Sequence, residues 1–397
     1  LNKNTPTCAL TDIMKHPLRL SYVIAALEEY APGALQEKWD NSGLQIGLPD
    51  GDGECTGVLL CVDVTESVIE EAARLGCNLV VSHHPLIFKG LRRIAGSTVT
   101  ERAAMAAIRS GIAVYSAHTS LDSTMGGVSY AMASRLGAEV ERVLVPSELQ
   151  FKRISVTCPR ELAASVRLVL LDHDAGTEPC SDNSSLSPTA PVADTDSAVS
   201  YYDCEEESLP KSPGPEPGVV DIRHTALTRV EAVVPAWKCA GLAASVTEIP
   251  GAESAKIDIL PLDNQPANLG LGVLASFPQP VSMAELADKI KKEFGCRAIR
   301  VSAAYAPDAK VRRIALCGGA GGEFIGKARS AGAQAYISAD IRYHDFADNR
   351  SGMAIFDIGH FESESCAKDI FYHVLTNKFA NFAVYYSEIE SNPVKYL

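Results

Sequence analysis

Residues 57–84 read GVLLCVDVTESVIEEAARLGCNLVVSHH and carry the pattern that sets the architecture of the chain. The runs 57–64 and 78–82 are continuously apolar and rich in β-branched residues, which is typical of strands buried on both faces of a parallel sheet. Residues 65–75 between them have apolar positions at helical spacing, and Gly76 is suited to end that helix. Strand, helix and strand in this order predict a right-handed α/β unit.

The same alternation continues on both sides of this unit. Apolar spacing predicts further helices over 20–30, 102–110, 127–136, 282–294, 322–330 and 362–378. Short β-branched runs predict further strands over 112–116, 311–316, 335–338, 353–357 and 382–386. Ser282 and Glu285 form a capping box at the start of one of these helices. The fold class is therefore α/β, with one lobe in 14–149 and a second lobe in 267–397.

The middle of the chain, 150–266, has a different pattern. Two strand-like runs, 151–157 and 229–234, are each followed by Pro and a helix-like stretch, which predicts a small inserted α+β domain. Between them, 175–218 is rich in Ser, Pro, Asp and Glu and holds nine acidic residues against one basic residue, Lys211. Such a segment buries too little apolar surface to offset its conformational entropy, so we expect a disordered acidic loop.

The composition excludes several classes of protein. The 397-residue chain has 36 basic and 49 acidic residues, a formal net charge of −13, which makes nucleic acid an unexpected partner. No apolar run reaches the roughly 18–20 residues that a membrane span needs, so we expect no membrane association. The 11 cysteines include no CxxC pair, which favours a reduced, cytoplasmic location over a disulfide framework. The chain begins with Leu1, and Met14 is a candidate start residue.

Histidine and carboxylate residues follow three of the predicted strands at their C-terminal ends, where α/β sheets bind ligands. These residues are His83 and His84, His118 and Asp122, and His360 and Glu364. The first pair can act together only if its strand has already ended, because neighbouring side chains on a strand face opposite ways. The other two pairs are each spaced by four residues. If a helix starts near His360, this spacing places His360 and Glu364 on one face of it.

Each cluster alone is also consistent with ordinary capping or hydrogen-bonded residues. With His118 set aside, they together offer five nitrogen and oxygen ligands, which suit Zn, Mn, Fe or Co and exceed the need of one tetrahedral ion. A site for two divalent metal ions, able to activate water and polarise a phosphoryl or carbonyl oxygen, therefore fits better. The five candidate ligands are His83, His84, Asp122, His360 and Glu364.

A glycine-rich stretch follows a predicted strand of the second lobe and opens a helix. The N–H groups of Gly318, Gly319 and Gly321 could hold a substrate anion there, although a tight turn would use the same residues. A P-loop is excluded, because Ala328 stands where that motif needs Ser or Thr.

Two histidines are candidates for proton transfer. They are His118 and His344, and a structural, hydrogen-bonded role is the alternative for His344. Residues 39–45, WDNSGLQ, indicate only a turn by their composition.

These motifs resemble those of the Nif-three-like family, whose members are also called type 2 GTP cyclohydrolase I homologues. The resembling stretches are WDNSGLQIG (39–47), VVSHHPLIFKGLRRI (80–94), SAHTSLD (116–122), ALCGGAGG (315–322), SADIRYHD (338–345), GHFESE (359–364) and NPVKYL (392–397). They span nearly the whole chain outside 150–266.

The resemblance implies a dinuclear metal site on the same five residues, with His118 as a nearby histidine outside the ligand set. It also implies a ring-like homohexamer, built as a trimer of dimers, and a PII/CutA-like fold for the inserted domain. The insert departs from the family, since Gly251 to Ser254 replace an expected His-Pro-Tyr-Glu stretch and the acidic loop replaces a Gly-rich segment. A ligand role for the insert is therefore not implied.

Two hypotheses of function follow. The first is a metal-dependent hydrolase that acts on a nucleotide or phosphoester, with the glycine-rich loop holding substrate phosphate. The family label also suggests opening of the GTP ring. The second is a non-catalytic hexameric scaffold that binds or handles metal and presents the inserted domains to partners. Turnover that depends on Asp122 would favour the enzyme, and metal-dependent capture of a partner without turnover would favour the scaffold.

Overall fold

The structure is a computed structural model that describes residues 17–148, 151–173, 199–208, 223–263 and 268–397. These residues form two compact units. The first unit combines the described residues up to Ser147 with those from 268 onward, and the second contains those from Glu148 to 263. The first unit, the core, is therefore discontinuous in the sequence. Met14 lies outside the described residues.

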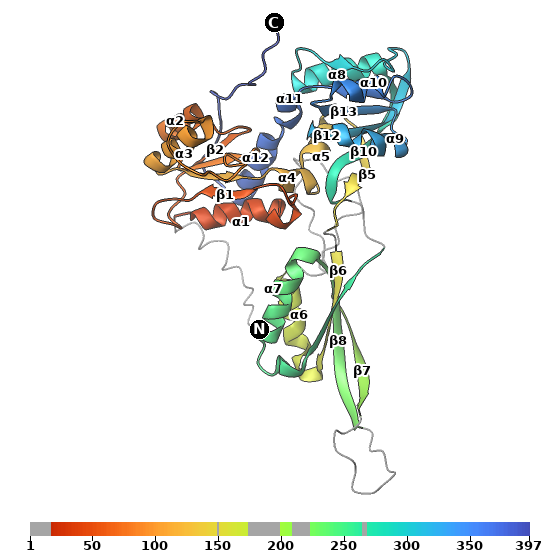
Figure 1. Cartoon of the computed structure of the whole chain (residues 1–397). Coiled ribbons are helices and arrows are strands. Elements are labelled where there is room, and N and C mark those ends of the chain that lie inside the picture. Colours follow the sequence, from red (N-terminus) through yellow and green to blue (C-terminus); the bar gives the residue numbers. More distant parts are fainter. Residues whose placement is uncertain (1–16, 149–150, 174–198, 209–222, 264–267) are drawn as a thin grey trace, which may run out of the picture. The chain divides into compact units, whose positions relative to one another are not determined.

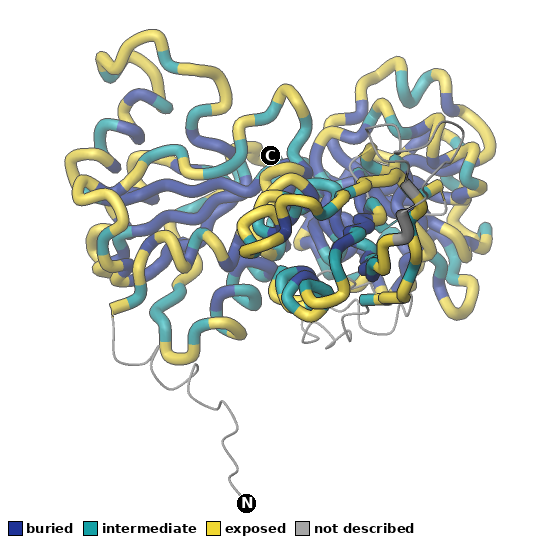
Figure 2. Tube along the Cα trace, turned by 90° about the horizontal axis from the view of Figure 1, so that it is seen from below, coloured by how far each residue is buried: buried dark blue, intermediate teal, exposed yellow. Residues whose placement is uncertain are grey.

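The first sheet of the core has five strands in the order β1-β4-β3-β2-β15. Strands β15, β2, β3 and β4 run parallel, and β1 pairs antiparallel with β4. Their bounds are β1 Gly43–Ile46, β2 Val58–Cys61, β3 Leu79–Ser82, β4 Ala113–Ser116 and β15 Val384–Tyr386. Every residue of β2, β3 and β4 is buried, because helices cover both faces of this sheet (Figure 2).

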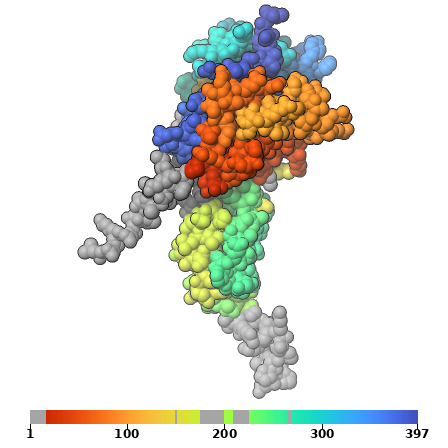
Figure 3. Space-filling model, turned by 90° about the vertical axis from the view of Figure 1, so that its left-hand side faces the viewer, coloured from red at the N-terminus to blue at the C-terminus, as the bar shows by residue number. Residues whose placement is uncertain are grey.

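Helices α2 and α3 pack on one face of the first sheet, and α1 and α12 pack on the other (Figure 1). Their bounds are α1 Leu20–Tyr30, α2 Glu66–Leu75, α3 Val99–Ser110 and α12 Ala367–Lys378. The residues of α1 to α3, coloured red to orange, form a continuous surface in Figure 3. Helix α2 ends at Gly76, whose φ of 75° is a left-handed conformation that glycine adopts without strain. The strand–helix–strand unit predicted from residues 57–82 is confirmed.

The second sheet of the core has six strands in the order β11-β14-β13-β12-β10-β5. Strands β12, β13 and β14 run parallel, and the remaining pairs are antiparallel. Their bounds are β5 Glu139–Pro146, β10 Gly270–Ser282, β11 Arg300–Val301, β12 Lys310–Ala320, β13 Ala335–Ala339 and β14 Ala354–Asp357. The last residue of β5, Pro146, pairs with the first residue of β10, Gly270. Strands β1, β5, β10 and β11 were not predicted from the sequence.

The remaining helices of the core pack mainly against the second sheet. They are α4 Thr119–Ser123, α5 Val128–Arg135, α8 Met283–Phe294, α9 Ile325–Ser330, α10 Tyr343–Ala347 and α11 His360–Glu364. One apolar cluster contains buried side chains from both core sheets, and α4, α5, α11 and α12 are seen between the sheets in Figure 1. The capping box of Ser282 and Glu285 is confirmed. The single helix expected over 362–378 is two helices, α11 and α12.

The second unit is a four-stranded antiparallel sheet in the order β7-β8-β6-β9. Its strands are β6 Phe151–Pro159, β7 Val199–Ser208, β8 Arg223–Pro235 and β9 Lys256–Pro261. Helices α6 (Ala163–Asp172) and α7 (Cys239–Thr247) follow β6 and β8, and their apolar side chains cover one face of the sheet. The two strand–helix halves predicted from the sequence are therefore confirmed.

The expected disorder of 175–218 is wrong for residues 199–208, which form β7 and pair along β8 from Val199 to Ser208. The sequence VSYYDC at the start of β7 has the β-branched and aromatic residues that strands favour, but the polar composition of the whole segment obscured it. The ring of Tyr201 also lies 4.2 Å from the guanidinium carbon of Arg167. The other residues of 175–218 lie outside the described residues.

The described part of the chain also bears on disulfide bonds and on membrane-spanning helices. None of the nine cysteines described there forms a disulfide. Among its helices, none combines the length and the apolar character that crossing a membrane requires.

Candidate metal centre

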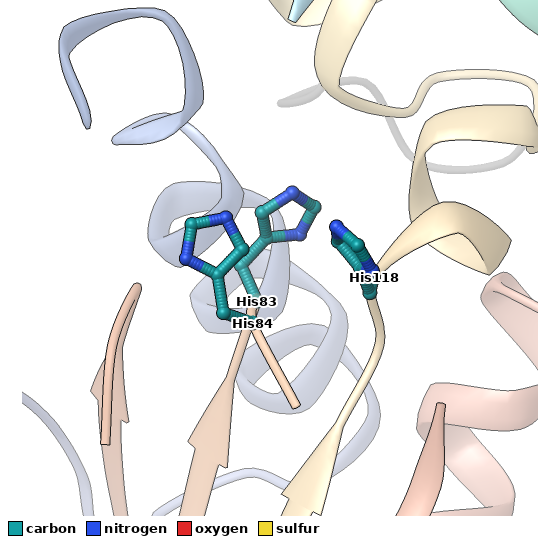
Figure 4. A group of neighbouring side chains, drawn as sticks. All are labelled: His83, His84 and His118. Atoms are coloured by element: carbon teal, nitrogen blue, oxygen red, sulfur yellow. The ribbon is translucent and has the colours of Figure 1, made fainter. Parts of the chain in front are cut away.

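Three imidazoles meet at one edge of the first core sheet. His83 and His84 directly follow β3, and His118 follows its parallel neighbour β4 (Figure 4). Strand β3 ends at Ser82, so the side chains of His83 and His84 need not point to opposite faces of the sheet, as neighbouring side chains within a strand do. Ring nitrogens of the three histidines lie within 4.8 Å of one another, and Figure 4 shows the rings gathered at the strand ends. The structure therefore brings together two of the three predicted clusters.

A second group of residues shares His84 with the first. The chain turns at Gly359 after β14, and α11 then begins at His360. One face of α11 presents both His360 and Glu364, as their spacing predicts. Atom Oε2 of Glu364 lies 2.8 Å from Nε2 of His84 and 3.0 Å from Nε2 of His360. The ligand atoms of these three residues also lie within 4.8 Å of one another.

The carboxylate of Glu364 lies between the two groups. Its Oε2 faces His84 and His360, whereas its Oε1 lies 3.7 Å from Nε2 of His83. The residue is only 2% exposed, so little water competes for these oxygens. The two oxygens of this carboxylate therefore face different imidazoles, and Glu364 contacts residues of both groups.

Two buried polar atoms in the cluster lack a hydrogen-bond partner among the described residues. They are Nε2 of His83 and Oδ1 of Asp122, which lie 3.8 Å apart. This distance is too long for a hydrogen bond. Two ligand atoms that are each about 2.0–2.2 Å from a common ion lie about 3–4 Å apart. The spacing therefore fits residues that hold a metal ion.

All four clustered histidines present the same ring nitrogen to an oxygen acceptor. The Nδ1 contacts are His83 to the Ala117 carbonyl at 3.0 Å, and His84 to Asp63, His118 to Asp40 and His360 to Asp340, each at 2.8 Å. When Nδ1–H donates to such an oxygen, the neutral ring keeps the lone pair of Nε2 for the site. A carboxylate or carbonyl behind the ring is the usual environment of a metal-binding histidine.

None of the three aspartates behind the rings was among the site residues predicted from the sequence. Asp63 and Asp340 follow the parallel strands β2 and β13, so their position after a strand was a usable signal. Asp40 lies in the turn that precedes β1, where composition indicated nothing more. Asp340 also adopts a φ of 52°, a left-handed conformation that is uncommon for residues other than glycine.

Several hydrogen-bond donors hold Asp40 in its ionised form. Besides facing His118, it accepts hydrogen bonds from the backbone N–H and the hydroxyl of Thr119. Burial alone would raise the pKa of Asp40, but the hydrogen bonds of His118 and Thr119 outweigh it and lower that pKa below its usual range. The charged aspartate fixes the orientation of His118, whose ring nitrogens belong to the first group.

The cluster favours positive charge on its imidazoles. Burial alone would lower the pKa of His84, but hydrogen bonds to Asp63 and Glu364 raise it to about 10. Burial opposes the charge of His360 as well, and contacts with Glu364 and Asp340 raise its pKa to about 9. Conversely, the surrounding histidines outweigh burial and hold the pKa of Glu364 well below its usual value. The carboxylates therefore create a site that stabilises cations.

The glycine-rich stretch is the end of β12, which continues through Gly318 and Gly319. The N–H of Gly318 donates to the hydroxyl of Ser129, and that of Gly319 donates to the hydroxyl of Ser363. A Cβ atom at position 319 would lie 2.1 Å from Oε1 of Glu364, so the absence of a side chain admits this carboxylate. Anion binding by Gly318, Gly319 and Gly321 stays a prediction.

The structure does not bring His344 into the cluster. It lies on α10 with an exposed side chain, and its ring contacts that of Tyr343 at a centroid distance of 5.4 Å. No hydrogen bond joins His344 to the four clustered histidines in the described residues. Its expected role in proton transfer therefore stays a prediction, and His118 is the better placed of the two.

The fold and the cluster define a mixed α/β protein with histidine and carboxylate groups that could hold metal ions at the ends of its strands. Residues 18–393 match the family described as Duf34/NIF3 (NGG1p interacting factor 3), and the chain belongs to this family. The resemblance inferred from the motifs is confirmed.

Curated relatives of this chain carry the name GTP cyclohydrolase 1 type 2 homolog. The relative from Mycobacterium bovis is 32% identical over 352 residues, which cover 87% of this chain and 88% of that protein. The relative from Bacillus subtilis is 28% identical over 382 residues, which cover 94% and 98%. The crystal structure of a Bacillus cereus protein related to NIF3 matches with a TM-score of 0.76 and 27% identity, covering 96% of this chain and all of that one. A Staphylococcus aureus protein with 23% identity shares the fold, with a TM-score of 0.70.

Proposed function

We propose that this protein is a cytoplasmic, divalent-metal-dependent hydrolase that acts on a nucleotide or another phosphoester. One observation carries the proposal, namely the four imidazoles whose Nδ1 atoms face oxygen acceptors while their Nε2 atoms are left for the site. The name of the relatives, GTP cyclohydrolase 1 type 2 homolog, supports hydrolytic chemistry on a nucleotide.

Two ion positions account for the five candidate ligands. His84, His360 and Oε2 of Glu364 would hold one ion, because their ligand atoms lie within 4.8 Å of one another. His83, Asp122 and Oε1 of Glu364 would hold the other, since the separations of 3.8 Å and 3.7 Å fit a shared ion. This donor set suits Zn, Mn, Fe or Co.

Divalent ions held there would lower the pKa of water and stabilise negative charge on a phosphoryl oxygen. The residues of the chain supply the rest of the chemistry. Asp40 fixes His118 so that Nε2 of this ring can take or return a proton at the site. Asp122 and Glu364 would balance the charge of bound ions, and burial of Glu364 and of the Oδ1 atom of Asp122 limits competing water.

The test is the metal content of protein purified without chelators or a His tag, measured beside turnover of nucleotides and simple phosphoesters. We expect about two ions per chain, loss of metal in Asp122→Asn and Glu364→Gln, and hydrolysis that requires the metal. Asp52→Asn is the matched control, because this exposed carboxylate accepts hydrogen bonds from Ser21 and takes no part in the cluster. Absence of stoichiometric metal after reconstitution would overturn the proposal, and metal binding without turnover would favour the scaffold.

We extend the proposal to the assembly of the protein. The second unit, with two helices on one face of an antiparallel sheet, is compatible with a PII/CutA-like fold. The family resemblance supports a homohexamer built as a trimer of dimers. Light scattering of the full-length protein would test this, and a monomeric mass would contradict it.

A further inference from the structure

Two large aromatic side chains are exposed beside the candidate metal centre. Trp39 is 59% exposed and Phe88 is 43% exposed. Their ring centroids lie 6.0 Å and 6.2 Å from that of His118, and 6.0 Å from each other. The two rings therefore flank the imidazole that we place at the site of proton transfer.

Polar side chains fasten the two segments that carry these rings. Asn41 donates its side-chain N–H to the carbonyl of Ile87 at 2.6 Å, and Gln45 accepts from the N–H of Ile87 at 3.2 Å. Asp40, directly after Trp39, is bonded to His118. Hydrogen bonds thus connect the residues next to both rings with each other and with His118. Such bonds hold the two rings in place before a ligand arrives, as a binding site requires.

Packing of the protein core does not account for these two rings. Three apolar residues near Phe88 in the sequence do pack inward, since Leu86 is buried and Ile87 and Leu91 pack against the apolar cluster of α2 and α3. Neither Trp39 nor Phe88 belongs to an apolar cluster among the described residues. Paired aromatic residues exposed at the mouth of a polar site are typical of ligand recognition.

We propose that Trp39 and Phe88 form the subsite that binds the planar ring of the substrate, a heterocycle of the nucleobase type. The inference rests on the proposed function and selects a nucleotide over a simple phosphoester as substrate. Trp39 meets its two aromatic neighbours at interplanar angles of 62° and 74°, and more than half of its surface stays exposed. Its indole therefore keeps a face on which a flat ring can stack.

The charge of the segment after Phe88 agrees with a nucleotide. Lys89, Arg92 and Arg93 are all exposed, although the chain as a whole has a net charge of −13. Neither Lys89 nor Arg92 forms a salt bridge with any residue that the structure describes. Unpaired cations next to a ring-binding pair suit a ligand that joins an aromatic ring to a phosphate.

Calorimetric titration of the full-length, metal-loaded protein with guanosine 5′-monophosphate and with ribose 5-phosphate tests the inference. The two compounds share the sugar phosphate and differ in the ring. We expect the ring-bearing compound to bind more tightly, and Trp39→Ala to weaken its binding roughly 10- to 100-fold. Binding of ribose 5-phosphate should change little, and Trp39→Phe should restore most of the difference because it keeps an aromatic face.

Matched variants separate a local effect from a general one. Tyr22→Ala removes a ring that is also 59% exposed but lies on α1, and it should leave both affinities unchanged. Phe88→Ala removes the second ring from a different segment. If Trp39→Ala loses its metal through the neighbouring Asp40, Phe88→Ala with full metal content decides the question.

The outcomes distinguish this inference from the proposed function. Equal binding of the two compounds to the wild type, or a preference unaffected by Trp39→Ala and Phe88→Ala, would overturn the ring subsite even if metal-dependent hydrolysis were found. Conversely, a preference that depends on Trp39 in protein without metal-dependent hydrolysis would keep the subsite and overturn the proposed function.

Discussion

Three of the four clustered histidines have an aspartate oxygen opposite Nδ1, and the fourth, His83, has the carbonyl of Ala117. An aspartate in this position fixes the orientation of the ring and makes its other nitrogen a stronger ligand. These aspartates are therefore the residues through which metal affinity can be changed without removing a ligand.

We expect Asp63→Asn to lower metal affinity about 10- to 100-fold. The amide oxygen of the introduced side chain could still accept from His84, but it carries no charge to support the ring. Competition with a chromophoric chelator measures the change. Asp52→Asn serves as the control and should match the wild type, and an unchanged affinity in Asp63→Asn would contradict a supporting role for this carboxylate.

The raised pKa values of His84 and His360, about 10 and about 9, give metal binding a defined pH dependence. Only the neutral rings bind a metal, so below these pKa values an ion must displace protons. Affinity should therefore increase with pH, by up to about tenfold per pH unit for each proton released. Chelator competition between about pH 6 and pH 9, with proton release measured by calorimetry in buffers of different ionisation enthalpy, checks the sign. Affinity that falls or stays constant as the pH rises would contradict it.

At the scale of secondary-structure elements, strand β12 and helix α11 can pack closely only because of one residue, Gly319. Gly319 has a φ of 60°, and a Cβ there would meet Glu364 at 2.1 Å. Helix α11 cannot withdraw easily, because the N–H of Gly319 donates to the hydroxyl of Ser363 on the same helix. The carboxylate of Glu364 can therefore occupy its position only because Gly319, at the end of β12, has no side chain.

Gly319→Ala should lower the free energy of unfolding by about 1–3 kcal/mol and reduce metal content, because it combines backbone strain with a clash at Glu364. Gly326→Ala is the matched control on α9, where a Cβ meets nothing within 4 Å. That change should leave stability the same or increase it by up to about 1 kcal/mol. Chemical denaturation and elemental analysis measure both effects, and equal behaviour of the two variants would refute the argument.

Among the secondary-structure elements, those that could be predicted from the sequence are the ones whose own consecutive residues carry a clear pattern. Strands β2 and β3 are buried on both faces and are therefore apolar throughout, which made the first α/β unit recognisable and placed the candidate ligands at strand ends. The end of β12 depends on a partner far away in the sequence, since Ala320 pairs with Ala339. The same holds for Asp40, which gains its role from His118, 78 residues further along. No local pattern records such a contact.

At the scale of the whole molecule, the candidate metal centre lies in the core alone, and the second unit contributes no residue that we assign to it. Every residue assigned to the metal centre belongs to the core. The chain leaves the core after β5 and returns at β10, where Pro146 pairs with Gly270 and the N–H of Ser147 donates to the carbonyl of Leu269 at 2.9 Å. The two ends of the excursion are therefore already neighbours in an antiparallel pair.

Replacing residues 148–266 by a short Gly-containing turn should leave a folded core with its metal content unchanged, because such a turn can join antiparallel strands. Elemental analysis and circular dichroism of the shortened protein measure this. Loss of metal from a shortened protein that remains folded would show that the second unit contributes to the site.

The candidate ligands come from both core sheets, and His84 and Glu364 are 280 positions apart in the chain. An unfolded chain cannot keep such distant residues together, so the ions should bind the native state almost exclusively. Free metal at about 100 times its dissociation constant would then add about 2.7 kcal/mol to the free energy of unfolding. The thermal midpoint should increase with the logarithm of free metal, and a midpoint independent of metal would contradict this. The amount of folded protein in a cell would in that case follow the supply of the ion.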